Sequence, residues 1–106
     1  MLIAWTTVAA RAEAERLARD AIAQRFAVCV QIDGPITSHY HWQGKLERTE
    51  EFRLCFKFLS PQQAALEAWL FARHPYETPE WFVVRADSVG EKYLSWALAS
   101  ATSSPL

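Results

Sequence analysis

The sequence lacks the features that mark several large classes of protein. No apolar run approaches the ~20 residues needed to cross a bilayer, and no basic block stands out among the 11 Lys and Arg and 12 Asp and Glu. We therefore expect neither membrane insertion nor binding to nucleic acid. The first residues also lack the charged start and the small-residue cleavage site of a signal peptide. A cytoplasmic location is the expectation that follows.

Motifs for catalysis and for structural zinc are missing too. The chain has no Gly-x-Ser-x-Gly, no glycine-rich phosphate loop and no His-Glu-x-x-His. Because no nucleophile can be paired with a base, we expect a protein that is not an enzyme. The two cysteines, Cys29 and Cys55, form no Cys-x-x-Cys and no zinc-spaced cluster. In a reducing cytosol they are expected to be free thiols that pack as small apolar side chains.

What the chain does have is enough apolar surface for one domain. Hydrophobic residues make up 51% of its 106 residues, which predicts a single folded domain over residues 1–101 and a flexible tail at 102–106. Strands are expected where β-forming or alternating apolar residues occur, at 2–8, 26–46, 51–58 and 81–86. Helices are expected at 9–25, 60–74 and from 88 onward.

Local signals place the bends, the turn and the caps. Asp33-Gly34-Pro35 predicts a bulge or bend in the second strand, and the polar run 47–50 predicts the hairpin turn. Capping boxes are expected for two helices, from Ser60 with Gln63 and from Ser88 with Glu91. The resulting β-α-β-β-α-β order with a final helix is the split βαβ pattern of an α+β ferredoxin-like sandwich.

Such a sandwich has a four-stranded antiparallel sheet with helices on one face, so its second face is uncovered. In this sequence, that face would carry aromatic residues of the long ribbon, and the ribbon would also present unpaired edges. Both features favour a partner that covers them. Closed self-association, as a trimer or a dimer with the sheets facing inward, satisfies both.

Two short segments hold most of the chemically capable side chains, Ser38–Lys45 and His74–Glu80. In the first segment, Tyr40 and Trp42 share one strand face, and two histidines share the other. The histidines, His39 and His41, could bind zinc or copper, or could equally lie on a solvated hairpin arm.

The second segment also admits two interpretations. His74 could favour the negative end of a helix dipole. Alternatively, it could lie at a pocket rim where imidazole, carboxylate and the Cys29 thiolate converge on a soft metal. Lys57, opposite a row of phenylalanines, is either a solvated lysine or an anion-binding group.

In these positions the sequence resembles the CutA-like divalent-cation tolerance proteins. The matching segments are Ala27-Val28-Cys29-Val30-Gln31, Ser38-His39-Tyr40-His41-Trp42-Gln43-Gly44-Lys45, Glu51 with Leu54 and Lys57, His74-Pro75-Tyr76-Glu77-Thr78-Pro79-Glu80, and Tyr93 with Trp96. The chain departs from the family pattern at Gln31, where asparagine is usual, and at Phe58, where threonine is usual.

The resemblance implies a PII-like homotrimer with a role in tolerance of copper and other divalent metals. It implies metal ligands at Cys29, His74 and Glu80. It also implies an inter-subunit pocket for a metal or a small ligand, lined by Tyr40, Trp42, Glu51, Lys57 and Tyr76. It makes no cofactor certain, and the candidate is copper or another divalent metal. The alternatives are an assembly module that serves another protein without a metal role of its own and, less supported, an enzyme acting on a small anion.

Overall fold

The computed structural model describes residues 1–102 and has mixed α+β architecture. Its elements are β1 (Leu2–Val8), α1 (Arg11–Ala23), β2 (Cys29–Trp42), β3 (Lys45–Phe58), a 3-10 turn (Ser60–Gln62), α2 (Gln63–Arg73), β4 (Phe82–Arg85) and α3 (Glu91–Ala101). The expected order of strands and helices is confirmed. The tail predicted at 102–106 lies outside the described residues from 103 onward. In the described part of the chain, no helix is long and apolar enough to cross a membrane.

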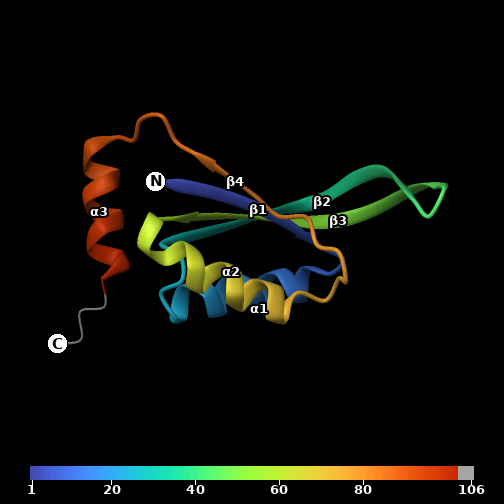
Figure 1. Cartoon of the computed structure of the whole chain (residues 1–106), viewed down its shortest axis with the longest axis horizontal. Coiled ribbons are helices and arrows are strands. Elements are labelled where there is room, and N and C mark those ends of the chain that lie inside the picture. Colours follow the sequence, from blue (N-terminus) through green and yellow to red (C-terminus); the bar gives the residue numbers. More distant parts are fainter. Residues whose placement is uncertain (103–106) are drawn as a thin grey trace.

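The four strands form one antiparallel sheet in the order β2-β3-β1-β4. Helices α1 and α2 lie against one face of this sheet, and α3 stands beyond one end of the strands (Figure 1). The opposite face is uncovered by any element of the described chain, as the same view shows. One side of the sheet is therefore core, and the other is surface.

The core lies between the sheet and the two helices. It is filled by the apolar side chains that occupy every second position of the strands. Leu54, Phe56 and Phe58 of β3 are fully buried, as period-2 patterning predicts. Leu66, Trp69 and Leu70 of α2 close over them at helical spacing. The remaining members of the cluster are Leu2, Ala4, Val8, Ala14, Leu17, Ala21 and Ala27.

Strands β2 and β3 continue well past the rest of the sheet as a two-stranded arm, residues 36–51. The last pair between β1 and β3 is Val8 with Phe52, so residues 45–51 of β3 pair only with β2. The register shifts between Asp33 and Ile36, where the arm begins. The predicted bend is confirmed at this position.

The hairpin turn at the tip of the arm was predicted in the wrong place. Trp42 pairs with Lys45, and the turn consists of Gln43 (φ 52°) and Gly44 (φ 78°). Two successive residues with positive φ form the type I′ turn whose twist matches that of the flanking strands. The polar run 47–50, which was expected to turn, continues the ladder of β3 instead, because its charged side chains remain solvated on the arm.

The predicted caps of the two later helices were also wrong. The amide of Leu59 donates to Oε1 of Gln62 at 2.8 Å. This is one half of a capping box, made by Gln62 rather than Gln63, because the leucine at the N-cap has no side-chain acceptor. Pro61 lies in this first turn, a 3-10 helix, where its missing N–H leaves no bond unmade. The N-cap of α3 is Gly90, without a side-chain cap, because the helix begins at Glu91, three residues beyond Ser88.

Candidate functional site

A cavity of about 840 Å³ runs along the arm, from its base to Trp42 near the tip. Its walls come from the arm, the end of β1 and the loop between α2 and β4, which are far apart in the sequence. Four of the five predicted pocket residues line it, namely Tyr40, Trp42, Glu51 and Tyr76, together with the predicted metal ligand Glu80. The two segments that carry the motifs thus meet in one place.

The centre of the cavity wall is a buried carboxylate held by a tyrosine. Glu51 is 8% exposed, and the hydroxyl of Tyr76 donates to its Oε2 at 2.8 Å. Burial, followed by the bond to Glu51, raises the pKa of Tyr76 far above its usual range. The phenol therefore keeps its proton and acts as a permanent donor to the carboxylate.

His74 fixes the loop that forms the opposite wall. The amide of Tyr76 donates to its Nδ1 at 3.0 Å, so Nε2 carries the proton and donates to the carbonyl of Thr7 at 3.0 Å. Nε2 also lies 2.9 Å from Oγ1 of Thr6. Both ring nitrogens are therefore used within the chain, and His74 joins the loop to β1.

We expect this histidine to make folding pH-dependent. Burial lowers the pKa of His74 below its ordinary 6.5, although the Thr7 carbonyl partly offsets this effect. The folded protein then binds fewer protons than the unfolded chain, so the free energy of unfolding falls as pH falls below about 6.5 and levels off below the folded pKa. Urea unfolding at a series of pH values measures this loss.

His74→Gln should flatten that part of the pH profile, because glutamine does not titrate. The matched control is His41→Gln, at an exposed position on the arm, which should retain the wild-type profile. An unchanged profile in the His74 variant would show that another group causes the acid sensitivity.

Glu80 also lies in the cavity wall. Burial, followed by the charge of Glu51, raises its pKa, and Arg53 opposes this shift. Arg53 donates from Nε and Nη2 to the carboxylate of Asp33, at 3.2 and 3.1 Å. The guanidinium that opposes this shift is therefore paired with a carboxylate that does not line the cavity.

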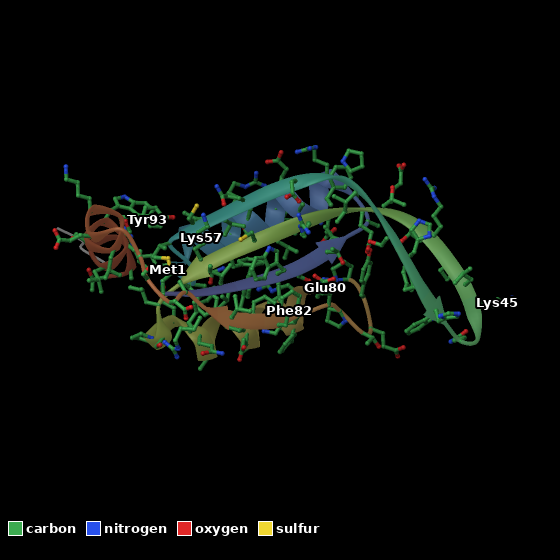
Figure 2. All side chains as sticks on the ribbon, turned by 90° about the horizontal axis from the view of Figure 1, so that it is seen from above. Met1, Lys45, Lys57, Glu80, Phe82 and Tyr93 are labelled. Atoms are coloured by element: carbon green, nitrogen blue, oxygen red, sulfur yellow. The ribbon has the colours of Figure 1, made fainter. Side chains whose placement is uncertain are left out.

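Lys57 and Cys29 lie at the other end of the sheet. They are directly opposite each other in the ladder of β2 and β3, whereas Thr7, which accepts from His74, is opposite Arg53. The two positions on β3 are ~13 Å apart along the strand. Nζ of Lys57 lies 5.9 Å from the centroid of the Tyr93 ring, and Figure 2 shows Lys57 near Tyr93 and away from Glu80.

Within one chain, the structure therefore does not bring the three proposed metal ligands together. No group of three or more His, Cys, Asp or Glu side chains among residues 1–102 could hold a metal ion. Cys29 and Cys55 are free and half-buried, and burial raises the pKa of the Cys55 thiol.

Other cavity residues were missed in the sequence, and some could have been found. Outside the two motif segments these include Thr7, Thr49 and Glu50, whereas Ser38, His39 and Glu77 lie within the segments but were not assigned to the pocket. A turn at Gln43-Gly44 pairs Ser38 with Thr49, so correct recognition of that turn would have placed Thr49 beside the motif. No comparable local signal connects Thr7 with the arm, since only the fold brings them together.

A family model described as CutA1 divalent ion tolerance protein matches residues 2–100. The chain belongs to this family. The resemblance seen in the sequence motifs is thereby confirmed across nearly the whole described chain. The divalent-cation tolerance protein CutA of Yersinia pestis is 36% identical over 99 residues, which cover 93% of this chain and 83% of that protein.

Solved structures of the family have the same fold. CutA from Synechococcus elongatus is 37% identical with a TM-score of 0.91, over 95% of this chain and 89% of that one. CutA1 from Pyrococcus horikoshii is 25% identical with a TM-score of 0.91, over 97% of this chain and all of that one (100%).

Proposed function

We propose that this protein is a non-catalytic homotrimer of the cytoplasm that contributes to tolerance of divalent metals, copper in particular. It binds a metal or a small ligand in clefts between its subunits. Its sheet order with helices on one face is compatible with the ferredoxin-like, PII-like sandwich that the sequence predicts. The metal role is supported by the family to which the chain belongs.

The observation that carries the assembly is the uncovered sheet face. Ile3, Trp5, Phe82 and Val84 lie together on it, on the neighbouring strands β1 and β4. The rings of Trp5 and Phe82 stack with centroids 5.3 Å apart, and Phe82 remains 49% exposed. A contiguous apolar patch of this kind on a small domain is typical of an interface.

Helix α3 extends this apolar surface. Tyr93 and Trp96 stack with centroids 5.4 Å apart, and both rings are exposed, as is Leu98. Only Ala97 of this helix is buried. A short helix in a protein gains most of its stability from packing against other elements, and α3 has little of that within its own chain. We therefore propose that a neighbouring copy supplies the missing contacts.

We propose that the metal ligands, Cys29, His74 and Glu80, act across subunits. Cys29 shares the uncovered face of the sheet, and a half-buried cysteine sulfur there suits a soft or borderline ion. A metal at His74 would displace the Tyr76 amide from Nδ1. In the same assembly, Lys57 of one copy would complete the cleft of the next.

Calorimetric titration of the reduced protein with Cu(I), Cu(II) and Zn(II) tests the metal role. We expect binding that weakens roughly tenfold or more in Cys29→Ser and in Glu80→Gln, because removing a ligand costs at least as much as removing its supporting contacts. Cys55→Ser is the matched thiol control and should bind as the wild type does. No binding, or equal binding by all variants, would contradict the proposal.

A second candidate is an assembly module that serves another protein. It is favoured by the internal use of both nitrogens of His74 and by the dispersed ligands of the single chain. In that case, the titration shows no metal binding, while affinity capture recovers a partner protein in a fixed ratio.

A further inference from the structure

Two histidines lie on the side of the arm that faces away from Tyr40 and Trp42. Side chains alternate along β3, and its even-numbered residues point to the helix side of the sheet, as the buried Leu54 does. His39 is directly opposite Arg48, and His41 is directly opposite Leu46. Both imidazoles therefore leave the helix side of the arm.

This side of the arm stays open in the proposed assembly. The interface is assigned to the other side of the sheet, where the rings of Trp5 and Phe82 stack. Helices α1 and α2 lie on the same side as the two histidines, but the arm extends beyond them (Figure 1). His39 borders the cavity, although alternation sends its side chain to the other side of β2 from Tyr40.

Both rings are accessible, and neither is committed within the chain. His39 and His41 are exposed, and Leu46, opposite His41, is 75% exposed, so no other element covers them. Among residues 1–102, the hydrogen bonds of imidazole nitrogens are those of His74. The ring nitrogens on the arm are therefore available to a ligand.

The spacing of the two histidines allows both rings to hold one ion. Alternate residues of a strand have Cα atoms ~6.7 Å apart, and their side chains stand roughly perpendicular to the sheet. A metal ion at roughly 2.0–2.1 Å from each nitrogen fits between two such rings, which solvent exposure leaves free to turn. Once one imidazole has bound the ion, the second binds it at a high effective concentration.

The ligands and the openness of the site indicate which ion fits. Imidazole suits copper, nickel and zinc. Arg48 opposes a cation beside His39, but Glu50, two positions along β3 on the same side, offsets that charge. No third His, Cys, Asp or Glu side chain of the described chain converges on the pair. Because the chain imposes no geometry, intrinsic affinity decides, and Cu(II) ranks above Ni(II) and Zn(II).

We propose that His39 and His41 form a metal site on the arm, an open chelate of two imidazoles that takes a borderline divalent cation, Cu(II) in preference to Zn(II). Each arm holds one ion, and water fills its other positions. The site shares no residue with the one proposed for Cys29, His74 and Glu80, and it does not depend on that one.

Titration of the full-length protein with Cu(II), followed by electron paramagnetic resonance, tests the site. The parent protein for the test has both cysteines replaced by serine, which removes the thiols that reduce Cu(II) and one ligand of the other proposed site. We expect one Cu(II) per chain, bound through two imidazole nitrogens, and weaker binding of Zn(II).

In this parent, His39→Gln and His41→Gln should each weaken Cu(II) binding by about tenfold or more. The two together should weaken it little further, because either change alone destroys the chelate. Thr37→Gln, at the next exposed position on the same side of the arm, is the matched control and should bind as the parent does. All of these positions are exposed, so the urea midpoints should stay close to that of the parent.

Unchanged Cu(II) affinity in either single variant would overturn the chelate, as would no binding by the parent. Half an ion per chain, with a doubled mass in light scattering, would show that two arms share the ion and that the site is not open. Since every protein in this test lacks the thiols, its failure leaves the role proposed for Cys29 untouched.

Discussion

Alanine in place of Gly34 is expected to destabilise the protein by about 2–5 kcal/mol. Gly34 has φ 148°, and a Cβ there would lie 2.7 Å from Cδ2 of Phe52 and 3.0 Å from the carbonyl oxygen of Glu51. Residues with a side chain rarely adopt that backbone conformation, so the strain in the backbone is not easily relieved. The contact with Phe52 is not easily relieved either, because that ring packs against the core. The shift of the urea midpoint at constant slope measures the loss.

Gly44→Ala is the matched control, since it separates backbone strain from crowding. Gly44 also has positive φ, at 78°, but a Cβ there would meet no atom within 4 Å. Its cost should be about 1–2 kcal/mol, from conformation alone. Equal losses in the two variants would show that the contact with Phe52 is not tight, and that the start of the arm is looser than the structure indicates.

Phe82→Glu is expected to convert the proposed trimer into monomers at micromolar concentration. The side chain is 49% exposed in the single chain, so the monomer fold tolerates the change. In the assembly, the same position would place an unpaired carboxylate from each copy in an apolar interface, at a cost of several kcal/mol each. Light scattering gives the mass directly.

The control for this variant is Phe71→Glu, on α2 and away from the uncovered face. Phe71 is 52% exposed, which makes the two substitutions closely comparable in chemistry and accessibility. The control protein should remain trimeric. A monomeric wild type, or dissociation of both variants alike, would refute the assignment of the interface to the sheet face.

The core could be predicted from the sequence, because burial follows short-range periodicity. Leu54, Phe56 and Phe58 alternate with polar neighbours, and that alternation determines which face of β3 they occupy. The same logic placed Leu66 and Leu70 on the inner side of α2. These patterns can be recognised without knowledge of the fold, because they depend on residues only a few positions apart.

The turn was missed because its sequence signal is weaker than that of the polar run that was predicted to turn. The caps were missed because their sequence signals are weak as well. Gln43-Gly44 is a short turn with one glycine, whereas the run at 47–50 is longer and more polar. Hydrophilicity alone does not distinguish a turn from a solvated strand. The need for two successive residues with positive φ does distinguish a tight turn from a solvated strand.

The candidate site was only partly predictable, because a sequence motif does not give the distances in space between its residues and those of other motifs. Tyr40 and Tyr76 meet in one cavity, as the two motif segments suggested. Cys29 lies elsewhere, since the register of β2 on β3 places it opposite Lys57. The role of Nε2 of His74 could not be deduced either, because Thr6 and Thr7 are 68 and 67 positions away in the sequence.

The arm has a mechanical consequence. It leaves the sheet near Gly34, and Trp42 lies eight positions further along β2, a lever of ~26 Å. A rotation of only about 5° at the bend would therefore displace the tip by ~2 Å. The cavity is lined at the pivot by Thr7 and Glu51 and near the tip by Trp42. Contacts made along this wall therefore oppose rotation of the arm about the bend.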